Sequence, residues 1–201
     1  MNLQNAQSLL RANIDKSRAV LSELDQLTEP LEQAATLLLT ALVNGRKVLC
    51  CGNGGSAADC AHLTAEIVGR YVLDRPGFAA VDLTANHSLM TALLNDFPHQ
   101  EIFARQVEAL GGEGDVLLAI STSGRSQNVK LALEKAPAHG LGTIAMLGKG
   151  GGDCAGLATV ELMVPSDNTQ RIQEAHLLLY HTLCDLMDPV LADSRLDMHL
   201  G

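Results

Sequence analysis

Five short apolar runs of strand length set the strongest limit on the fold of this chain. They are Lys47–Cys51, Phe78–Leu83, Asp115–Ile120, Thr143–Leu147 and Thr159–Val164. Most are apolar at successive positions, which indicates burial of both strand faces, as in a parallel sheet. Segments of helical character separate them at about 57–71, 87–110 in two pieces and 126–139, with a short turn near 153–157. This alternation predicts an α/β fold, a doubly wound parallel five-stranded sheet with helices on both faces.

Helical segments flank the five runs at both ends of the chain. Apolar residues at helical spacing predict one helix from residue 3 to about 26, and a second from Pro30 to the Asn44-Gly45 stop signal. We expect these two to form an N-terminal helical hairpin suited to dimer packing, and a long amphipathic helix over about 170–192 to close the chain. With no internal repeat or linker in the sequence, we predict a single domain over 1–201, with a helical extension at 1–45 and an α/β core at 46–201.

Composition and charge narrow the classes of function. Hydrophobic residues make up 47% and charged residues 18%, which favours a packed core over disorder. Aromatic residues are only 2%, so the core must be aliphatic and rich in alanine. The net charge of −9 argues against direct contact with nucleic acid or an anionic membrane, because such surfaces are bound through Lys and Arg. A small anion is still compatible, since backbone N–H groups at a helix start can hold it.

The cysteines and the N-terminal segment favour a cytoplasmic location. The cysteines are odd in number and lack C-x-x-C spacing, which predicts reduced, mostly buried thiols rather than disulfides or a thiolate metal site. They are Cys50, Cys51, Cys60, Cys154 and Cys184. The N-terminal segment is polar, without a visible signal peptide, and no apolar stretch reaches the roughly 18–20 residues of a membrane span.

Two loops are expected at the carboxyl edge of the sheet, where open parallel sheets bind ligands. The first is Cys51-Gly52-Asn53-Gly54-Gly55-Ser56. Its three glycines let a ligand approach the backbone closely, and Ser56 suits the N-cap of the following helix. The loop matches neither GxGxxG nor the P-loop, so taken alone it is better explained as a tight turn.

The second loop, Ser121-Thr122-Ser123-Gly124-Arg125-Ser126, carries four hydroxyl groups at a strand-to-helix turn. Hydroxyl groups together with the N–H groups of a helix start are suited to a phosphate. Ordinary helix capping needs one hydroxyl rather than four, so we favour phosphate binding. Arg125 would either add positive charge to this site or face solvent.

Ionisable side chains on two predicted helices supply candidate chemistry. His62 and Glu66 are four residues apart and share one helix face, and Gln173 and His181 are about two turns apart on the last helix. A carboxylate and a histidine beside a sugar phosphate are what aldose–ketose isomerisation needs. The carboxylate removes a proton next to the carbonyl, and the histidine moves protons among the oxygens. The two histidines and the glutamate are also standard metal ligands, with glutamine a weaker one, although each residue alone is more commonly a surface or core residue.

Four separated motifs together resemble the sugar isomerase (SIS) domain family. They are CGNGGSAADCAHLTAEIVGRY, the dipeptide Asn95-Asp96, GDVLLAISTSGRSQNV and RIQEAHLLLYHTLCDL. Within that family the chain resembles the phosphoheptose isomerases, which convert D-sedoheptulose 7-phosphate to D-glycero-D-manno-heptose 7-phosphate for the heptose of the bacterial lipopolysaccharide core. The resemblance covers nearly the whole chain, the terminal helices included.

The resemblance implies a role for each motif. It gives Glu66 as general base and His181 as partner acid. It implies phosphate contacts from Ser121, Thr122, Ser123 and Ser126, and further substrate contacts from Asn53, Gly54, Gly55, Ser56, Glu66, Asn95, Asp96 and Gln173. In some members the residues equivalent to His62, Glu66, Gln173 and His181 bind zinc, which implies one Zn²⁺ per subunit. The family is tetrameric, which implies a homotetramer whose active sites draw on neighbouring subunits.

Two other functions occur among relatives of the same family. Some SIS-domain tetramers are non-catalytic and bind the bacterial replication initiator; they lack the glutamate and the last histidine that this chain has as Glu66 and His181. Yet the region 45–51, the Ser-Thr-Ser-Gly loop and the ending near Cys184 also resemble that branch. Gln170 stands where some isomerases have an acidic residue, so no helper carboxylate is expected there. A sugar-phosphate sensor fused to a DNA-binding module is disfavoured, because no basic helix-turn-helix segment flanks the domain.

Overall fold

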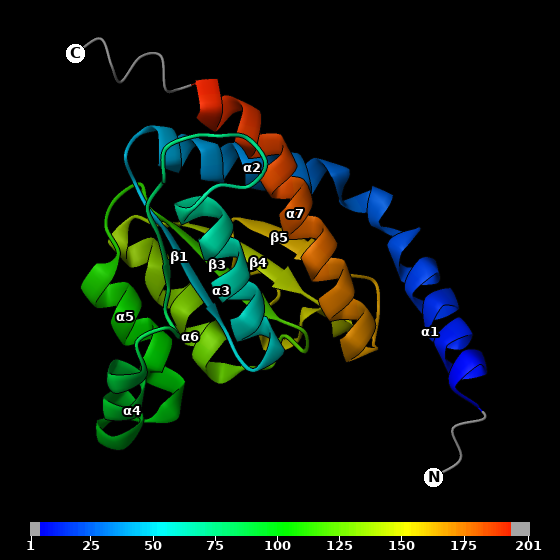
Figure 1. Cartoon of the computed structure of the whole chain (residues 1–201). Helices are drawn as coiled ribbons and strands as arrows, with labels where there is room; N and C mark the ends of the chain where they lie inside the picture. The colour runs from blue at the N-terminus through cyan, green and yellow to red at the C-terminus, as the bar shows by residue number, and fades with distance from the viewer. Residues whose placement is uncertain (1–4, 194–201) are drawn as a thin grey trace.

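Five parallel strands form the centre of the molecule in the computed structural model, which describes residues 5–193 (Figure 1). They are β1 (Val48–Gly52), β2 (Ala80–Asp82), β3 (Val116–Ser121), β4 (Gly142–Leu147) and β5 (Val160–Met163). Their order in the sheet is β2-β1-β3-β4-β5, and every neighbouring pair is parallel. Each strand lies within one or two residues of its predicted range. The predicted parallel five-stranded sheet is therefore confirmed.

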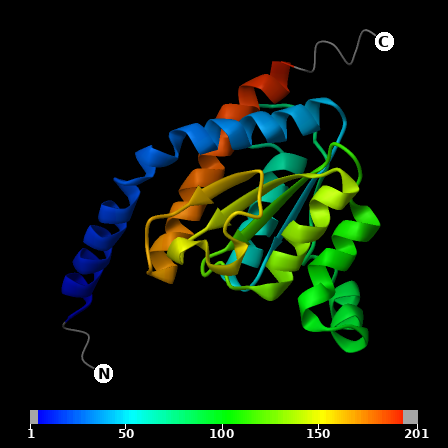
Figure 2. The ribbon, with the colours of Figure 1, turned by 180° about the vertical axis from the view of Figure 1, so that it is seen from behind.

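Helices cover the sheet on both faces (Figures 1 and 2). One hydrophobic cluster joins the strands to α2 (Thr28–Val43), α3 (Gly55–Val68) and α7 (Thr169–Asp193). A second cluster on the other face joins them to α4 (His87–Asp96), α5 (Ile102–Leu110) and α6 (Gln127–Lys135). Every residue of β1 and β3 is buried, as their continuous apolar sequences predict.

Short 3₁₀ helices connect several of these elements. They are η2 (Leu24–Leu27), η3 (His99–Glu101), η4 (Ala136–His139) and η5 (Lys149–Cys154). The two helical pieces predicted over 87–110 are α4 and α5, with η3 between them. The helix predicted over 126–139 is α6 continued by η4. The turn predicted near 153–157 lies earlier, as η5, because residues 149–152 all take positive φ angles and turn the chain directly after β4.

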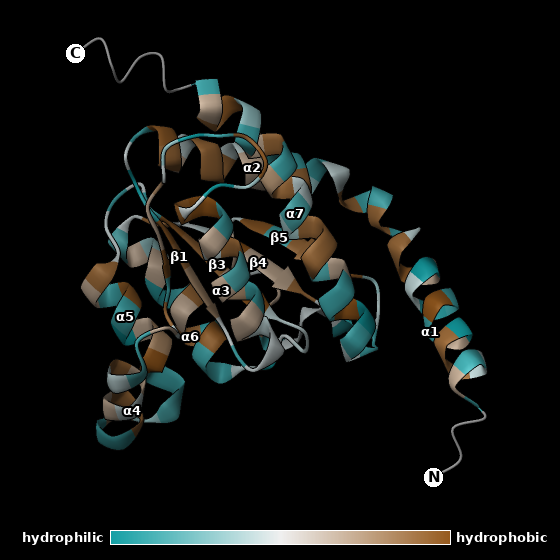
Figure 3. Cartoon of the chain, in the orientation of Figure 1, coloured by the Kyte–Doolittle hydropathy of each residue, from teal (hydrophilic) through white to brown (hydrophobic). Residues whose placement is uncertain are grey.

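The two N-terminal helices differ from the predicted hairpin. They are α1 (Ala6–Leu21) and α2, and the predicted start at residue 3 lies outside the described residues. Both views show α1 and α2 following one another as a bent rod rather than folding back (Figures 1 and 2). The four residues of η2 change the direction of the chain but do not reverse it. No residue of α1 is buried: Val20 and Leu21 at its end pack partly against the core, whereas Leu9 and Leu10 are each 62% exposed. In Figure 3, hydrophobic and hydrophilic bands alternate along α1.

The sequence also predicts mostly buried cysteines and no apolar stretch of membrane-spanning length. All five cysteines are buried in the core. Within residues 5–193, none of the helices combines the length and the apolar composition that crossing a membrane requires.

Candidate active site

Two loops start side by side at the carboxyl edge of the central strands. The glycine loop (residues 52–56) leads from β1 into α3, and the hydroxyl loop (residues 121–126) leads from β3 into α6. β1 and β3 are paired, with Gly52 opposite Ile120. Asn53 of the glycine loop and Asn128 in the first turn of α6 exchange two amide hydrogen bonds, each 2.9 Å long. The two loops are therefore tied together, as a shared ligand site requires.

The hydroxyl groups of the hydroxyl loop are not used to cap α6. Ser126 occupies the N-cap position of α6, but its side chain makes no capping hydrogen bond. Its Oγ lies 3.2 Å from Ser121 Oγ, which itself accepts a hydrogen bond from Gly124 N at 3.1 Å. Ser123 Oγ accepts one from Arg125 N at 3.2 Å. The three serine hydroxyl groups thus gather within the loop, beside a helix start whose N-cap side chain makes no capping hydrogen bond, and this arrangement suits an anion.

The start of α3 differs from its prediction. Gly54, with φ 57°, is the N-cap residue, and no described side chain caps the helix. Ser56 is not the cap: it lies inside α3 and is buried, with 4% of its surface exposed. A glycine can take a positive φ without the strain that a Cβ would bring, which is why the helix begins two residues earlier than a serine cap would place it.

Two other glycines mark close approaches of neighbouring segments. A Cβ at Gly124, where φ is 60°, would overlap the carbonyl oxygen of Gly151, so the glycine run of η5 packs directly against the hydroxyl loop. A Cβ at Gly55 would overlap the side-chain amide of Gln173. Gln173, in the first turns of α7, therefore lies over the start of α3 and beside the glycine loop.

Three ionisable side chains meet between α3 and α7, which pack side by side (Figure 1). They are His62, Glu66 and His181, here called the His–Glu–His group, and one ligand atom from each lies within 4.8 Å of the others. His62 Nε2 is 3.1 Å from Glu66 Oε1, and the ring centroids of the two histidines are 5.0 Å apart. The structure thus brings together both predicted catalytic residues and three of the four predicted metal ligands.

Gln173 is the fourth predicted metal ligand, and its contact with this group stays a prediction. It precedes His181 by eight residues, which is about 12 Å along an α-helix. Its amide lies at Gly55, two helical turns before the level of His62 on α3. Two nitrogen donors and one carboxylate are nonetheless a donor set that zinc and similar divalent ions accept, with a further position left for water or substrate. The residues present therefore fit a metal ion.

Two tyrosines that the sequence analysis did not single out border the His–Glu–His group. Tyr180 is fully buried, and its hydroxyl oxygen lies 2.9 Å from His62 Nδ1. Burial, together with the nearby charge of Asp59, raises the pKa of Tyr180 above its usual value. The ring of Tyr71 lies 5.9 Å from that of His181. Adjacency to His181 in the sequence was the one available signal for Tyr180.

A buried ion pair fixes the segment that carries Tyr71. Arg75 Nε donates to Asp188 Oδ1 at 2.7 Å, and both side chains are 3% exposed. Arg75 Nη2 also donates to the backbone carbonyl of Glu66 at 2.7 Å. Burial alone would raise the pKa of Asp188, but the hydrogen bonds from Leu73 N, Arg75 and Val72 N lower it overall. These hydrogen bonds join the end of α3 to α7 and so hold in place the part of α3 that carries Glu66.

Asn95 and Asp96 lie at the end of α4 and are exposed. Asn95 Nδ2 donates to Asp96 Oδ1 at 2.7 Å. Among the described residues, no hydrogen bond joins either of them to the other candidate residues. Their predicted contact with substrate stays a prediction.

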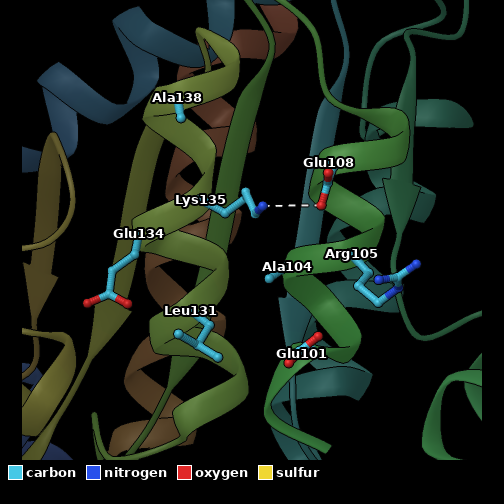
Figure 4. A pocket seen from close by; sticks show the side chains of 8 residues that line it. All are labelled: Glu101, Ala104, Arg105, Glu108, Leu131, Glu134, Lys135 and Ala138. Carbon is cyan, nitrogen blue, oxygen red and sulfur yellow. Dashed lines mark hydrogen bonds and ion pairs between the residues drawn. The ribbon is translucent and has the colours of Figure 1, made fainter. Parts of the chain in front are cut away.

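A groove of about 410 Å³ lies between α5 and α6, on the other face of the sheet from α3 and α7 (Figure 4). An ion pair of 3.1 Å between Lys135 Nζ and Glu108 Oε2 bridges it. None of the predicted site residues lines this groove, so the candidate chemistry lies elsewhere, at the two loops and the His–Glu–His group.

Comparisons with known proteins agree with this arrangement. The profile of the SIS domain matches residues 13–148. A phosphoheptose isomerase of Helicobacter pylori strain P12 is 49% identical over 170 residues, which are 85% of this chain and 88% of that protein. The structure of the phosphoheptose isomerase from Neisseria gonorrhoeae is similar at a TM-score of 0.86 and 43% identity, covering 92% of this chain and 99% of that one. A phosphoheptose isomerase from Francisella tularensis matches at a TM-score of 0.87 and 37% identity, over 92% and 98% of the two chains. The chain belongs to the SIS-domain family and, within it, to the group of the phosphoheptose isomerases.

Proposed function

We propose that this protein converts D-sedoheptulose 7-phosphate to D-glycero-D-manno-heptose 7-phosphate. The observation that carries the proposal is that Glu66 of α3 meets His181 of α7. α3 itself begins at the glycine loop, beside the hydroxyl loop that suits a phosphate. Membership in the phosphoheptose isomerase group supplies the substrate class. The resemblance further implies that the product serves the heptose of the lipopolysaccharide core.

The phosphate would be held by the hydroxyl loop, with the starts of α6 and α3 adding backbone N–H groups. Its hydroxyl ligands are Ser121, Thr122, Ser123 and Ser126. The sugar would then extend along α3, because Gly55 and His62 are seven residues, about 10.5 Å of helix axis, apart. Further contacts are proposed for Asn53, Gly54, Gly55, Ser56, Asn95, Asp96 and Gln173. This length suits an extended sugar phosphate whose reacting end reaches Glu66.

The reaction moves one proton between carbon atoms and one between oxygen atoms. Glu66 removes a proton from C1 of the ketose while His181 donates a proton to the O2 carbonyl oxygen, which gives an enediol. The O1 hydroxyl then returns a proton to His181, and the protonated Glu66 delivers its proton to C2. The product is the aldose, and both side chains are back in their starting states.

A zinc ion, one per subunit, is proposed for the His–Glu–His group, with Gln173 as a candidate further ligand. When bound, zinc would polarise the sugar oxygens as a Lewis acid. The donor set of two imidazoles and a carboxylate supports zinc. Its requirement is tested by activity and metal content after chelation and reconstitution.

We further propose a cytoplasmic homotetramer built from a single domain over residues 1–201. Exposed apolar side chains on α1 and α7 support assembly: Leu10 is 62%, Leu178 46% and Val190 47% exposed. The five buried thiols support a reducing compartment. Light scattering is expected to give the mass of four chains, and the mass of one chain would contradict the assembly.

An NMR time course with sedoheptulose 7-phosphate tests the proposed activity. We expect signals of the manno-heptose 7-phosphate to appear with the native protein and not with Glu66→Gln, a nearly isosteric change that keeps the fold. No conversion with or without zinc, despite measurable binding of the sugar phosphate, would instead favour the non-catalytic SIS-domain proteins that bind the replication initiator.

A further inference from the structure

Both ring nitrogens of His62 are engaged by groups from different helices. Nε2 faces Glu66 Oε1 at 3.1 Å, one turn along α3, and Nδ1 faces the Tyr180 hydroxyl of α7 at 2.9 Å. The Tyr180 side chain is fully buried, whereas the His62 side chain is 44% exposed. The half-exposed imidazole of His62 is thus held at Nδ1 by the buried phenol of Tyr180.

The acceptor character of Glu66 determines where the His62 proton lies. An ionised carboxylate only accepts hydrogen bonds, so Nε2 of a neutral His62 must carry the proton that points to Glu66. Nδ1 then has a lone pair and accepts the proton of the Tyr180 hydroxyl. In the metal-free protein, Tyr180 is therefore the donor and His62 is the Nε2–H tautomer.

We propose that Tyr180 is a positioning residue, whose hydroxyl holds the orientation of His62 in either tautomer and exchanges its donor role for an acceptor role when a metal ion binds Nε2. The inference rests on the proposed metal-binding role of the His–Glu–His group. A metal at Nε2 needs the lone pair of that nitrogen, so the proton must lie on Nδ1 and point at Tyr180. A hydroxyl serves both states because it donates and accepts, whereas a carboxylate in its place would favour only the metal-bound tautomer.

In the second state we expect Asp59 to accept the Tyr180 proton. Asp59 precedes His62 by three residues and so lies on the same face of α3. Its Oδ2 is buried and has no hydrogen-bond partner among the described residues, and its charge acts on Tyr180. The proton count balances: Nε2 releases one proton to solvent, Nδ1 takes one from solvent, and the tyrosine keeps its own.

The tautomer of His62 is measured directly by long-range ¹H–¹⁵N spectra of ¹⁵N-histidine-labelled, metal-free protein at pH 8, above the ordinary histidine titration range. The signals that disappear in His62→Gln identify the residue. We expect the Nε2–H tautomer in the native protein and the Nδ1–H tautomer after addition of Zn²⁺. Tyr180→Phe should keep the Nε2–H tautomer, which Glu66 requires, and weaken Zn²⁺ binding about 10-fold or more in competition with a chelator. Tyr71→Phe, which removes a phenol hydroxyl beside the same group, should leave the Zn²⁺ affinity unchanged.

Each outcome decides the inference without reference to turnover. An Nδ1–H tautomer in the native metal-free protein would overturn it, as would an unchanged Zn²⁺ affinity in a folded Tyr180→Phe protein. If Tyr180→Phe does not fold, the native tautomer and its change on adding Zn²⁺ still decide. If the proposed isomerase activity were refuted, the expected spectra would not change. Failure of the Tyr180 inference and failure of the proposed function are therefore distinguishable.

Discussion

Acidification from pH 7 to pH 5 should cost the fold about 2 kcal/mol through one buried histidine, His176, when its pKa shift is integrated over that range. The His176 side chain is fully buried within α7, and its Nε2 donates to the Leu147 carbonyl at 3.3 Å. Its Nδ1 has no partner among the described residues. Burial lowers the pKa of His176 from 6.5 to about 4, despite the opposing effect of that hydrogen bond. Between these values the unfolded chain binds more protons than the folded one, so stability falls as the pH falls.

The contribution of His176 is isolated by comparing urea unfolding of the native protein with that of His176→Leu at pH 7 and pH 5, at one protein concentration. The variant leaves no orphaned carbonyl, because Leu147 also accepts from Val164 N at 2.9 Å. A comparison is needed because burial raises the pKa of Asp59 to about 6, which stabilises the folded state as the pH falls. We expect the native protein to lose about 2 kcal/mol more than the variant, or about 1 M in the urea midpoint. His99→Leu, at an exposed histidine, is the matched control. Equal losses in native and His176→Leu proteins would refute the reasoning.

Three further substitutions address the site and its supports. Ser123→Ala combined with Ser126→Ala should weaken binding of the sugar phosphate at least several-fold without unfolding the protein, and an unchanged affinity in calorimetry would count against the hydroxyl loop as phosphate site. Asp188→Asn should lower the free energy of unfolding by about 3 kcal/mol, because it leaves a buried guanidinium without its counter-charge; a loss below 1 kcal/mol in urea titrations would contradict this. Gly55→Ala should displace the flexible Gln173 side chain and raise KM while the fold persists, and it should add nothing in a Gln173→Ala background.

The sheet could be predicted from the sequence because its evidence is local. Runs such as Val48–Gly52 and Val116–Ser121 are apolar at nearly every position, and this alone requires burial on both faces. The path of the N-terminal helices could not be predicted in the same way. Whether the chain reverses after Leu21 depends on what η2 packs against rather than on its own four residues.

The site was predictable to the extent that its residues share one helix. His62 and Glu66 are linked by helical spacing, whereas their meeting with His181 depends on how α3 packs on α7, which no local pattern determines. The partners that sequence reasoning missed are far apart along the chain. Asn53 and Asn128 are 75 residues apart, and Tyr180 lies 118 residues from His62. No periodicity in the sequence reports contacts at that separation.

Isomerisation in D₂O tests the central claim most directly, because it follows the proton that Glu66 is proposed to carry. The proton removed from C1 of sedoheptulose 7-phosphate should exchange with solvent on the Glu66 carboxyl group before delivery to C2. The native protein should therefore form manno-heptose 7-phosphate that carries deuterium at C2, while a folded Glu66→Gln protein that still binds the sugar phosphate should show neither product nor exchange. Deuterium incorporation by Glu66→Gln at a rate near that of the native protein would contradict the account.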